Sequence, residues 1–181
     1  MMNGMAPIPA SPHIVLSADS IQGRIIRVDT CQREFSTAFS DPALGPSDNG
    51  IPLGINGLKI TQDYMYFTNS AKGTFSRVKI DQAGNKVGCF ETLATLPNVT
   101  MDGNLYDDFG IDARESAYVA IHPNSVNKIA KDGTQTLLAG GEDSDLVQDP
   151  TAVAMANDER SIYIATGGGT MGGGQVIKVR L

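Results

Sequence analysis

Three polar residues recur at matching places in a repeated pattern, and their side chains suit a divalent cation. Asn3, Asn56 and Asp107 each stand near the start of a segment in which apolar and polar residues alternate, and Thr151 has the same place in a fourth such segment. Amide and carboxylate oxygens are preferred ligands of hard cations such as Ca²⁺. If the four segments converge on one axis, these residues form a candidate metal and substrate site.

Turn chemistry is the simpler alternative for each position. Asn-Gly at residues 3–4 and 56–57 and Asp-Asp at residues 107–108 are also typical of tight turns at the start of a strand. The agreement of three polar residues at equivalent repeat positions favours a site over three separate turns.

The elements that must position these residues are strands. Apolar residues alternate with polar ones over short runs that are separated by turn residues, and helix signals are scarce. The predicted strands are residues 14–17, 24–29, 34–39, 58–60, 64–68, 75–80, 91–96, 110–112, 117–121, 126–130, 135–139, 152–155, 161–165 and 176–180.

The strands fall into four repeating groups, at residues 3–45, 54–97, 106–140 and 150–181. A period of about 40–50 residues with about four strands in each unit is typical of a β-propeller. We therefore predict an all-β single domain made of four-stranded antiparallel blades, in which the first strand of each blade lines a central channel. An ordinary antiparallel sandwich is the alternative, but it does not require repeats at this spacing.

Composition narrows the classes of partner. The 181 residues include 14 Lys and Arg against 20 Asp and Glu, so the net charge is -6. This charge disfavours nucleic acid and anionic membrane surfaces as partners and leaves a small-molecule substrate. No apolar run is long enough to span a membrane and no signal peptide opens the chain, which as given is expected to stay inside the cell.

The two cysteines, Cys31 and Cys89, are too few for a disulfide framework. One bridge between them is an open alternative. Two free, buried thiols are the favoured expectation, because unpaired cysteine is among the most buried residue types.

Five segments resemble one family of six-bladed propellers, the senescence-marker-protein/gluconolactonase/regucalcin family, and its fungal branch in particular. The segments are residues 17–29, 54–60, 66–70, 107–112 and the glycine-rich residues 165–169. Their order and spacing carry the resemblance more than any one of them alone.

The resemblance implies a channel metal held by an early Glu, an Asn and an Asp. Asn56 matches the ligand Asn and Asp107 the ligand Asp, which in the family is also the proposed general base of lactone hydrolysis. Asn3 matches an Asn that faces the substrate, and Tyr106, Asp108 and Phe109 are expected beside the substrate. The implied cofactor is a divalent metal, Ca²⁺ first, with Zn²⁺ or Mg²⁺ as alternatives.

The chain departs from the family pattern in two ways. The usual Pro-Asp-Gly reads Tyr106-Asp107-Asp108 here, so Asp108 is a rival for the role of Asp107. The early Glu has no counterpart, because only four of six blades are represented. Either the propeller is truncated, in which case its uncovered blade faces favour self-association, or the four blades close differently, as a true four-bladed ring.

Three functions remain open. The first is metal-assisted hydrolysis of a lactone or similar ester. The second is a hetero-Diels-Alderase of fungal tropolone-terpenoid biosynthesis, with an apolar pocket for which Tyr106, Phe109, Met5 and Met101 are available. The third is an inactive remnant. His122 could line the channel, but a lone His after a strand is more often a core or surface residue.

Overall fold

The computed structural model describes residues 1–142, 144–169 and 172–181. The described chain is almost entirely strand, with one short 3₁₀ helix, η1 (Pro42–Leu44). It divides into two compact units, unit 1 (Met1–Thr95) and unit 2 (Leu96–Leu181), and each is described by itself. Within the described residues, no helix has the length and apolar character needed to cross a bilayer.

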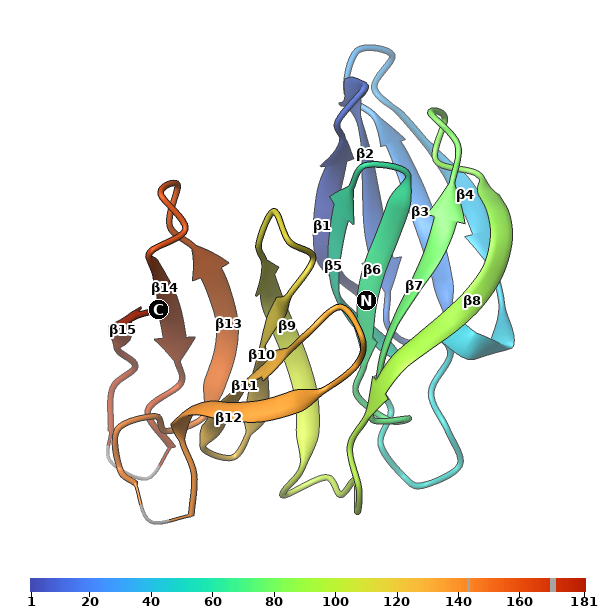
Figure 1. Cartoon of the computed structure of the whole chain (residues 1–181). Coiled ribbons are helices and arrows are strands. Elements are labelled where there is room, and N and C mark those ends of the chain that lie inside the picture. Colours follow the sequence, from blue (N-terminus) through green and yellow to red (C-terminus); the bar gives the residue numbers. More distant parts are fainter. Residues whose placement is uncertain (143, 170–171) are drawn as a thin grey trace. The chain divides into compact units, whose positions relative to one another are not determined.

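Unit 1 consists of two four-stranded antiparallel sheets, each with its strands in chain order (Figure 1). The first sheet contains β1 (Met2–Ile8), β2 (Ser11–Asp19), β3 (Arg24–Asp29) and β4 (Glu34–Ser40). The second contains β5 (Ile55–Thr61), β6 (Tyr64–Asn69), β7 (Thr74–Ile80) and β8 (Lys86–Thr95).

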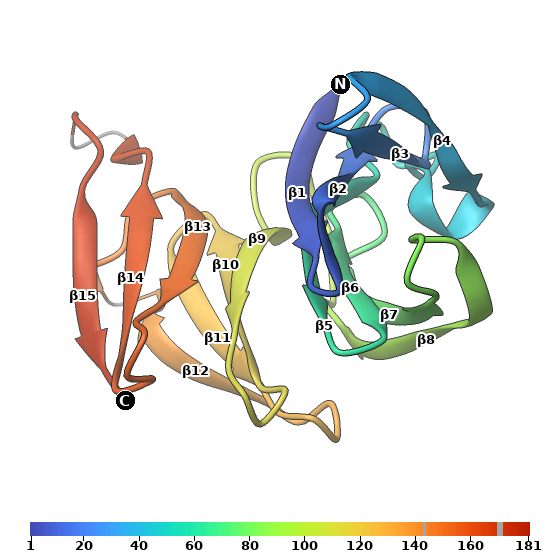
Figure 2. The ribbon, with the colours of Figure 1, turned by 90° about the horizontal axis from the view of Figure 1, so that it is seen from above.

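Unit 2 repeats this plan with one four-stranded and one three-stranded sheet, and Figure 2 shows their strands from above. The first sheet contains β9 (Leu105–Ile111), β10 (Ala117–His122), β11 (Ser125–Ile129) and β12 (Gln135–Gly140). The second contains β13 (Pro150–Met155), β14 (Ser161–Thr166) and β15 (Val176–Arg180).

The sheets are propeller blades, so the predicted fold class is confirmed. Within each unit the two sheets approach one another mainly through their first strands, β1 with β5 and β9 with β13. The two sheets of a sandwich would instead face one another across all their strands. The blades follow one another at the period that the sequence predicts.

Alternation along the strands builds the cores between paired sheets. In unit 1, Leu16 and Ile25 from the first sheet and Leu58 and Phe67 from the second belong to one buried cluster. In unit 2, Val126, Val153, Ile162 and Ile164 belong to another. Since successive strand residues point to opposite faces, the same strands leave a second set of side chains on each outer face.

The four aligned polar positions all lie at irregularities of strand register. In β9, Tyr106 pairs with Ile121 and Phe109 with Val119, so the two residues 107–108 face the single residue Ala120. The same kind of shift occurs at residues 3–4 of β1, 56–57 of β5 and 151 of β13. Such β-bulges redirect side chains and are common beside functional sites.

Two details of the sequence interpretation need correction. The strand predicted at residues 110–112 is the end of β9, which begins at Leu105, because the bulge interrupts its alternation. Both cysteines are free, but the expectation that they are buried is wrong, since both are exposed. Cys31 lies in the turn between β3 and β4, and Cys89 lies on the outer strand β8.

Candidate active site

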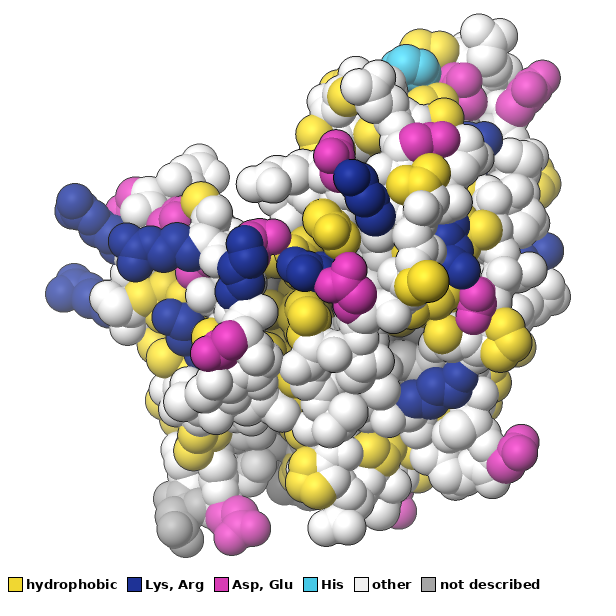
Figure 3. Space-filling view, turned by 45° about the vertical axis from the view of Figure 1, so that its right-hand side comes forward, with side chains coloured by type: hydrophobic (Ala, Val, Ile, Leu, Met, Phe, Trp, Pro, Cys, Tyr) yellow, Lys and Arg dark blue, Asp and Glu magenta, His cyan; other side chains and the backbone are white. Residues whose placement is uncertain are grey.

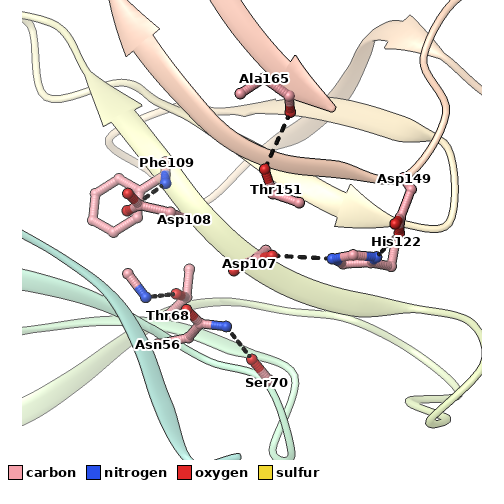
Figure 4. A network of polar contacts seen from close by, with 11 residues as sticks. Asn56, Thr68, Ser70, Asp107, Asp108, Phe109, His122, Asp149, Thr151 and Ala165 are labelled. Atoms are coloured by element: carbon pink, nitrogen blue, oxygen red, sulfur yellow. Dashed lines mark hydrogen bonds and ion pairs between the residues drawn. The ribbon is translucent and has the colours of Figure 1, made fainter. Parts of the chain in front are cut away.

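Three ionisable side chains of unit 2 contact one another in a chain that includes Asp107. His122 Nε2 lies 3.0 Å from Asp107 Oδ2, and His122 Nδ1 lies 2.6 Å from Asp149 Oδ1 (Figure 4). Asp107 is in the bulge of β9, His122 ends β10, and Asp149 directly precedes β13. Antiparallel pairing of His122 with Leu105 brings the end of β10 beside the start of β9.

The backbone around Asp149 fixes its carboxylate against the imidazole. Asp149 has a positive φ of 56°, which is uncommon for a residue with a side chain. Its N–H donates to Pro123 O and its carbonyl accepts from Gly167 N, both across 2.7 Å. A conformation of this kind persists where surrounding structure enforces it, and such positions cluster at functional sites.

The two carboxylates favour the protonated form of His122. The hydrogen bond to Asp107 is the largest cause and raises the pKa of His122 above its ordinary value, while burial opposes the shift and Asp149 adds to it. In the imidazolium both ring nitrogens are donors, which matches the two carboxylate partners. This arrangement holds the Asp107 carboxylate in one orientation, as a positioned proton acceptor requires.

The three neighbours of Asp107 on β9, Tyr106, Asp108 and Phe109, differ in their burial and in their hydrogen bonds. Asp108 Oδ1 accepts from its own neighbour, Phe109 N, across 2.8 Å. The Tyr106 and Phe109 side chains are fully buried. Tyr106 Oη donates to Gln135 Oε1 across 2.6 Å, and burial raises the pKa of its phenol. The two rings therefore form part of the blade core, and their predicted contact with substrate stays a prediction.

In unit 1, the amide nitrogen of Asn56 is hydrogen-bonded, whereas its amide oxygen has no hydrogen-bond partner among the described residues. Its Nδ2 donates to Ser70 Oγ across 2.9 Å, which fixes the amide plane. Its Oδ1 is buried and, among the described residues, has no hydrogen-bond partner. The adjacent Gly57 N donates to Thr68 Oγ1 across 2.9 Å. Asn3 is half-buried in the equivalent bulge of β1.

Single groups within each unit suit a divalent cation as ligands. An orphaned buried carbonyl oxygen such as Asn56 Oδ1 is costly without a partner, and a cation would satisfy it. The Asp107 carboxylate is a suitable anionic ligand. Within the described ranges, however, no group of three or more His, Cys, Asp or Glu side chains is arranged to hold a metal. Both His122 nitrogens already face carboxylates, so the imidazole is not a further ligand.

Charge is unevenly distributed between the two ends of the sheets in unit 2. The end that carries the Asp107–His122–Asp149 chain also carries Asp102, Asp108, Glu142 and Asp145. The basic residues of unit 2 lie at or near the opposite strand ends: Arg114, Lys128, Lys131, Arg160, Lys178 and Arg180. In Figure 3, several Lys and Arg side chains gather at the left of the view. The local field at the site end thus favours cations and neutral molecules over anions.

Sequence reasoning placed Asp107 in the candidate site but missed its two partners. His122 had been expected to be a core or surface residue, and Asp149 had not been considered. A usable signal was present, because Asp149 stands two residues before Thr151 in the repeat register. Thr151 itself donates from Oγ1 to Ala165 O at 3.5 Å, a long hydrogen bond.

Comparison with known proteins identifies the fold but no family. No protein-family profile and no curated protein sequence matches the chain. Among solved structures, regucalcin from Agrobacterium tumefaciens, described as a calcium-binding protein, aligns with a TM-score of 0.65 and 18% identity over 94% of this chain and 55% of its own. A nidogen/laminin complex aligns at 0.60 and 16% over 99% of this chain and 59% of its own.

A luciferin-regenerating enzyme aligns with a TM-score of 0.56 and 16% identity over the whole of this chain and 78% of its own. The chain spans little more than half the length of the first two structures. At these identities the likeness establishes propeller architecture, which enzymes and binding proteins share.

Proposed function

We propose that the chain is a small-molecule hydrolase of the gluconolactonase-like propeller type, with Asp107 as the general base. The observation that carries the proposal is the fixed Asp107 carboxylate, redirected by a β-bulge and held by His122, which Asp149 holds in turn. The likeness to regucalcin and to a luciferin-regenerating enzyme supports an enzyme of this architecture.

The proposed reaction opens a neutral lactone with water. Asp107 accepts a proton from the water, whose oxygen forms a bond to the ester carbonyl carbon. The ring C–O bond then breaks, and the leaving alkoxide takes the proton back from Asp107, which yields a hydroxy acid. The acidic surroundings of the site suit an uncharged substrate and disfavour the carboxylate product.

Asn56 and Asp107 are the residues proposed to hold a divalent cation, Ca²⁺ in the first place. When bound, such a cation would polarise the ester carbonyl and lower the pKa of a water. The protein's own contribution is the orientation of Asp107 and a buried amide oxygen at Asn56.

The test is a panel of uncharged five- and six-membered lactones, with proton release followed at constant pH. We expect at least one lactone to be hydrolysed above the buffer rate, with loss of activity in a chelator and recovery on addition of Ca²⁺. Folded protein that hydrolyses none of them in the presence of Ca²⁺, Zn²⁺ or Mg²⁺ would contradict the proposal and favour the inactive remnant.

The Diels-Alderase alternative has less support. Of the four side chains available for its apolar pocket, Tyr106 and Phe109 are buried in the blade core, and Met5 and Met101 are each 56% exposed. A pericyclase would not hydrolyse the lactones with or without a chelator, so chelator-sensitive hydrolysis favours the hydrolase over the pericyclase.

A further inference from the structure

The outer face of the first sheet carries an apolar groove away from the core of unit 1. The groove has a volume of about 510 Å³ and is lined by Met2, Ile26, Val28, Asp29, Thr30, Arg33, Glu34 and Phe35. Ile25 belongs to the core, so alternation places Ile26 and Val28 on the opposite, outer face. Phe35, which pairs with Val28, is 80% exposed. An aromatic side chain this exposed is unusual unless it has a partner.

The three-stranded sheet of unit 2 has an outer face of complementary character. Ile164 and Ile177 pack toward the core of unit 2, so Tyr163, Val176 and Lys178 lie on the other face. Val176 is 74% exposed. Small residues pair beside these side chains, with Ala165 opposite both Ala152 and Val176.

We propose that the outer face of the first sheet in one copy packs against the outer face of the last sheet in a second copy. This contact would repeat between copies the burial of apolar side chains that already joins the two sheets of each unit. It joins two different surfaces, so a dimer keeps one free face of each kind, and association can continue head to tail or close into a ring.

Charge complementarity favours this pairing over groove against groove. Two carboxylates, Asp29 and Glu34, line the groove together with one guanidinium, Arg33. The outer face of the last sheet carries Lys178 and Arg180, and Lys178 Nζ lies 5.6 Å from the centre of the Tyr163 ring. Burial of the Phe35 ring, roughly 150–250 Å² for an aromatic residue, supplies the apolar contribution.

Sedimentation velocity between about 1 and about 200 µM tests the proposal. We expect the mass to rise from that of the 19.1 kDa monomer to at least a dimer. Phe35→Ser and Val176→Ser should each weaken association at least about tenfold, since each exposes a polar group where an apolar one is buried. Val87→Ser is the matched control, because Val87 is 56% exposed on β8 outside the groove.

Mixing the two variants identifies the pairing. Phe35→Ser retains an intact last sheet, and Val176→Ser retains an intact groove, so an equimolar mixture should form a dimer that neither variant forms alone. Retention of parental association by Val176→Ser would show groove-to-groove contact and overturn the proposal. An effect of Val87→Ser equal to that of Phe35→Ser would also overturn it.

The natural thiols give an independent readout on the unmodified chain. Cys31 is exposed in the turn that supplies Thr30 and Arg33 to the groove, and Cys89 is exposed on β8. Alkylation of Cys31 should slow as the protein concentration rises, while alkylation of Cys89 should not. A chain that stays monomeric up to about 200 µM overturns the proposal, and slow Cys31 alkylation at every concentration would then show that the same chain fills its own groove.

Discussion

The carboxylate of Asp149 occupies the space that a side chain on Gly167 would need. A Cβ on Gly167 would lie 2.5 Å from Asp149 Oδ2 and 3.3 Å from Asp149 Cγ. Gly167 N also donates to Asp149 O across 2.7 Å. The absence of a side chain at residue 167 therefore allows the carboxylate to reach His122.

Gly167→Ala should displace the Asp149 carboxylate and loosen its 2.6 Å contact with His122. We expect a loss of about 1–2 kcal/mol in the free energy of unfolding, measured in urea, because a close approach must be relieved. Gly45→Ala is the control, since a Cβ there would meet its nearest atom at 3.6 Å.

A double-mutant cycle isolates the cause. In an Asp149→Ala background the carboxylate is gone, so Gly167→Ala should have little further effect. An equal loss in both backgrounds would mean that Gly167 serves another purpose and that the steric account is wrong.

Most of the fold could be predicted from the sequence, because the alternation of apolar and polar residues and the spacing of the repeats can be read directly along the chain. Residues 24–29 and 176–180 were predicted with their observed bounds. The prediction was least accurate at two first strands: none of the predicted ranges covers β1, and only the end of β9 was predicted, because the bulge at Asp107 and Asp108 breaks the alternation. The sequence interpretation also missed the exposure of Cys89, because the residue type alone does not show which face of the outer strand β8 the side chain occupies.

Only part of the candidate site could be predicted from the sequence. Repeat register identified Asn3, Asn56 and Asp107, and all three lie in strand irregularities. The partnership of Asp107 with His122 and Asp149 depends on antiparallel pairing and on the hydrogen bond from Asp149 N to Pro123 O, between residues far apart in the sequence, which no local pattern encodes. Successive residues of a regular strand face opposite ways, but Asp107 and Asp108 lie in a bulge, where this alternation does not hold.

Asn56→Ala should reduce stabilisation by Ca²⁺. The buried Oδ1 of Asn56 has no partner in the described part of the chain, so a bound cation would gain this oxygen as a ligand. We expect Ca²⁺ to raise the melting temperature of the parent more than that of Asn56→Ala, and Asn104→Ala at an exposed site to behave as the parent. Equal Ca²⁺ shifts in all three proteins would exclude Asn56 as a ligand.

Calorimetric titration with Ca²⁺ decides which carboxylate of β9 takes part. Asp107→Asn should bind more weakly than the parent, because cation affinity rises with carboxylate number. If Asp108→Asn loses binding and Asp107→Asn does not, Asp108 is the ligand and the assignment of Asp107 is wrong.

Asp41 should make stability pH-dependent at low pH. The Ala43 N–H donates to Asp41 Oδ1 across 3.0 Å and is the first cause that lowers the pKa of Asp41, and Lys86 at 3.2 Å adds to it. A lowered folded-state pKa contributes stability above the unfolded value of about 3.9, and this stability is lost as pH falls through the folded value.

Asp41→Asn should therefore cost less than about 1 kcal/mol at pH 6, because the carboxylate is partly exposed and screened. The difference from the parent in urea unfolding should shrink as pH falls below about 4. Asp48→Asn, at an exposed carboxylate in the same loop, is the control. A difference that stays constant down to about pH 2.5 would contradict this assignment.

The rate of lactone hydrolysis by Asp107→Asn, compared with the parent and with Asp145→Asn, tests the central claim most directly. An amide in place of the Asp107 carboxylate would keep the shape of the side chain but could not accept a proton, so kcat should fall by about 10²–10⁴-fold. Asp145 is an exposed carboxylate at the same end of the sheets, and its variant should retain the parental rate. Parental kcat in folded Asp107→Asn, on the lactone that the parent hydrolyses fastest, would contradict the account.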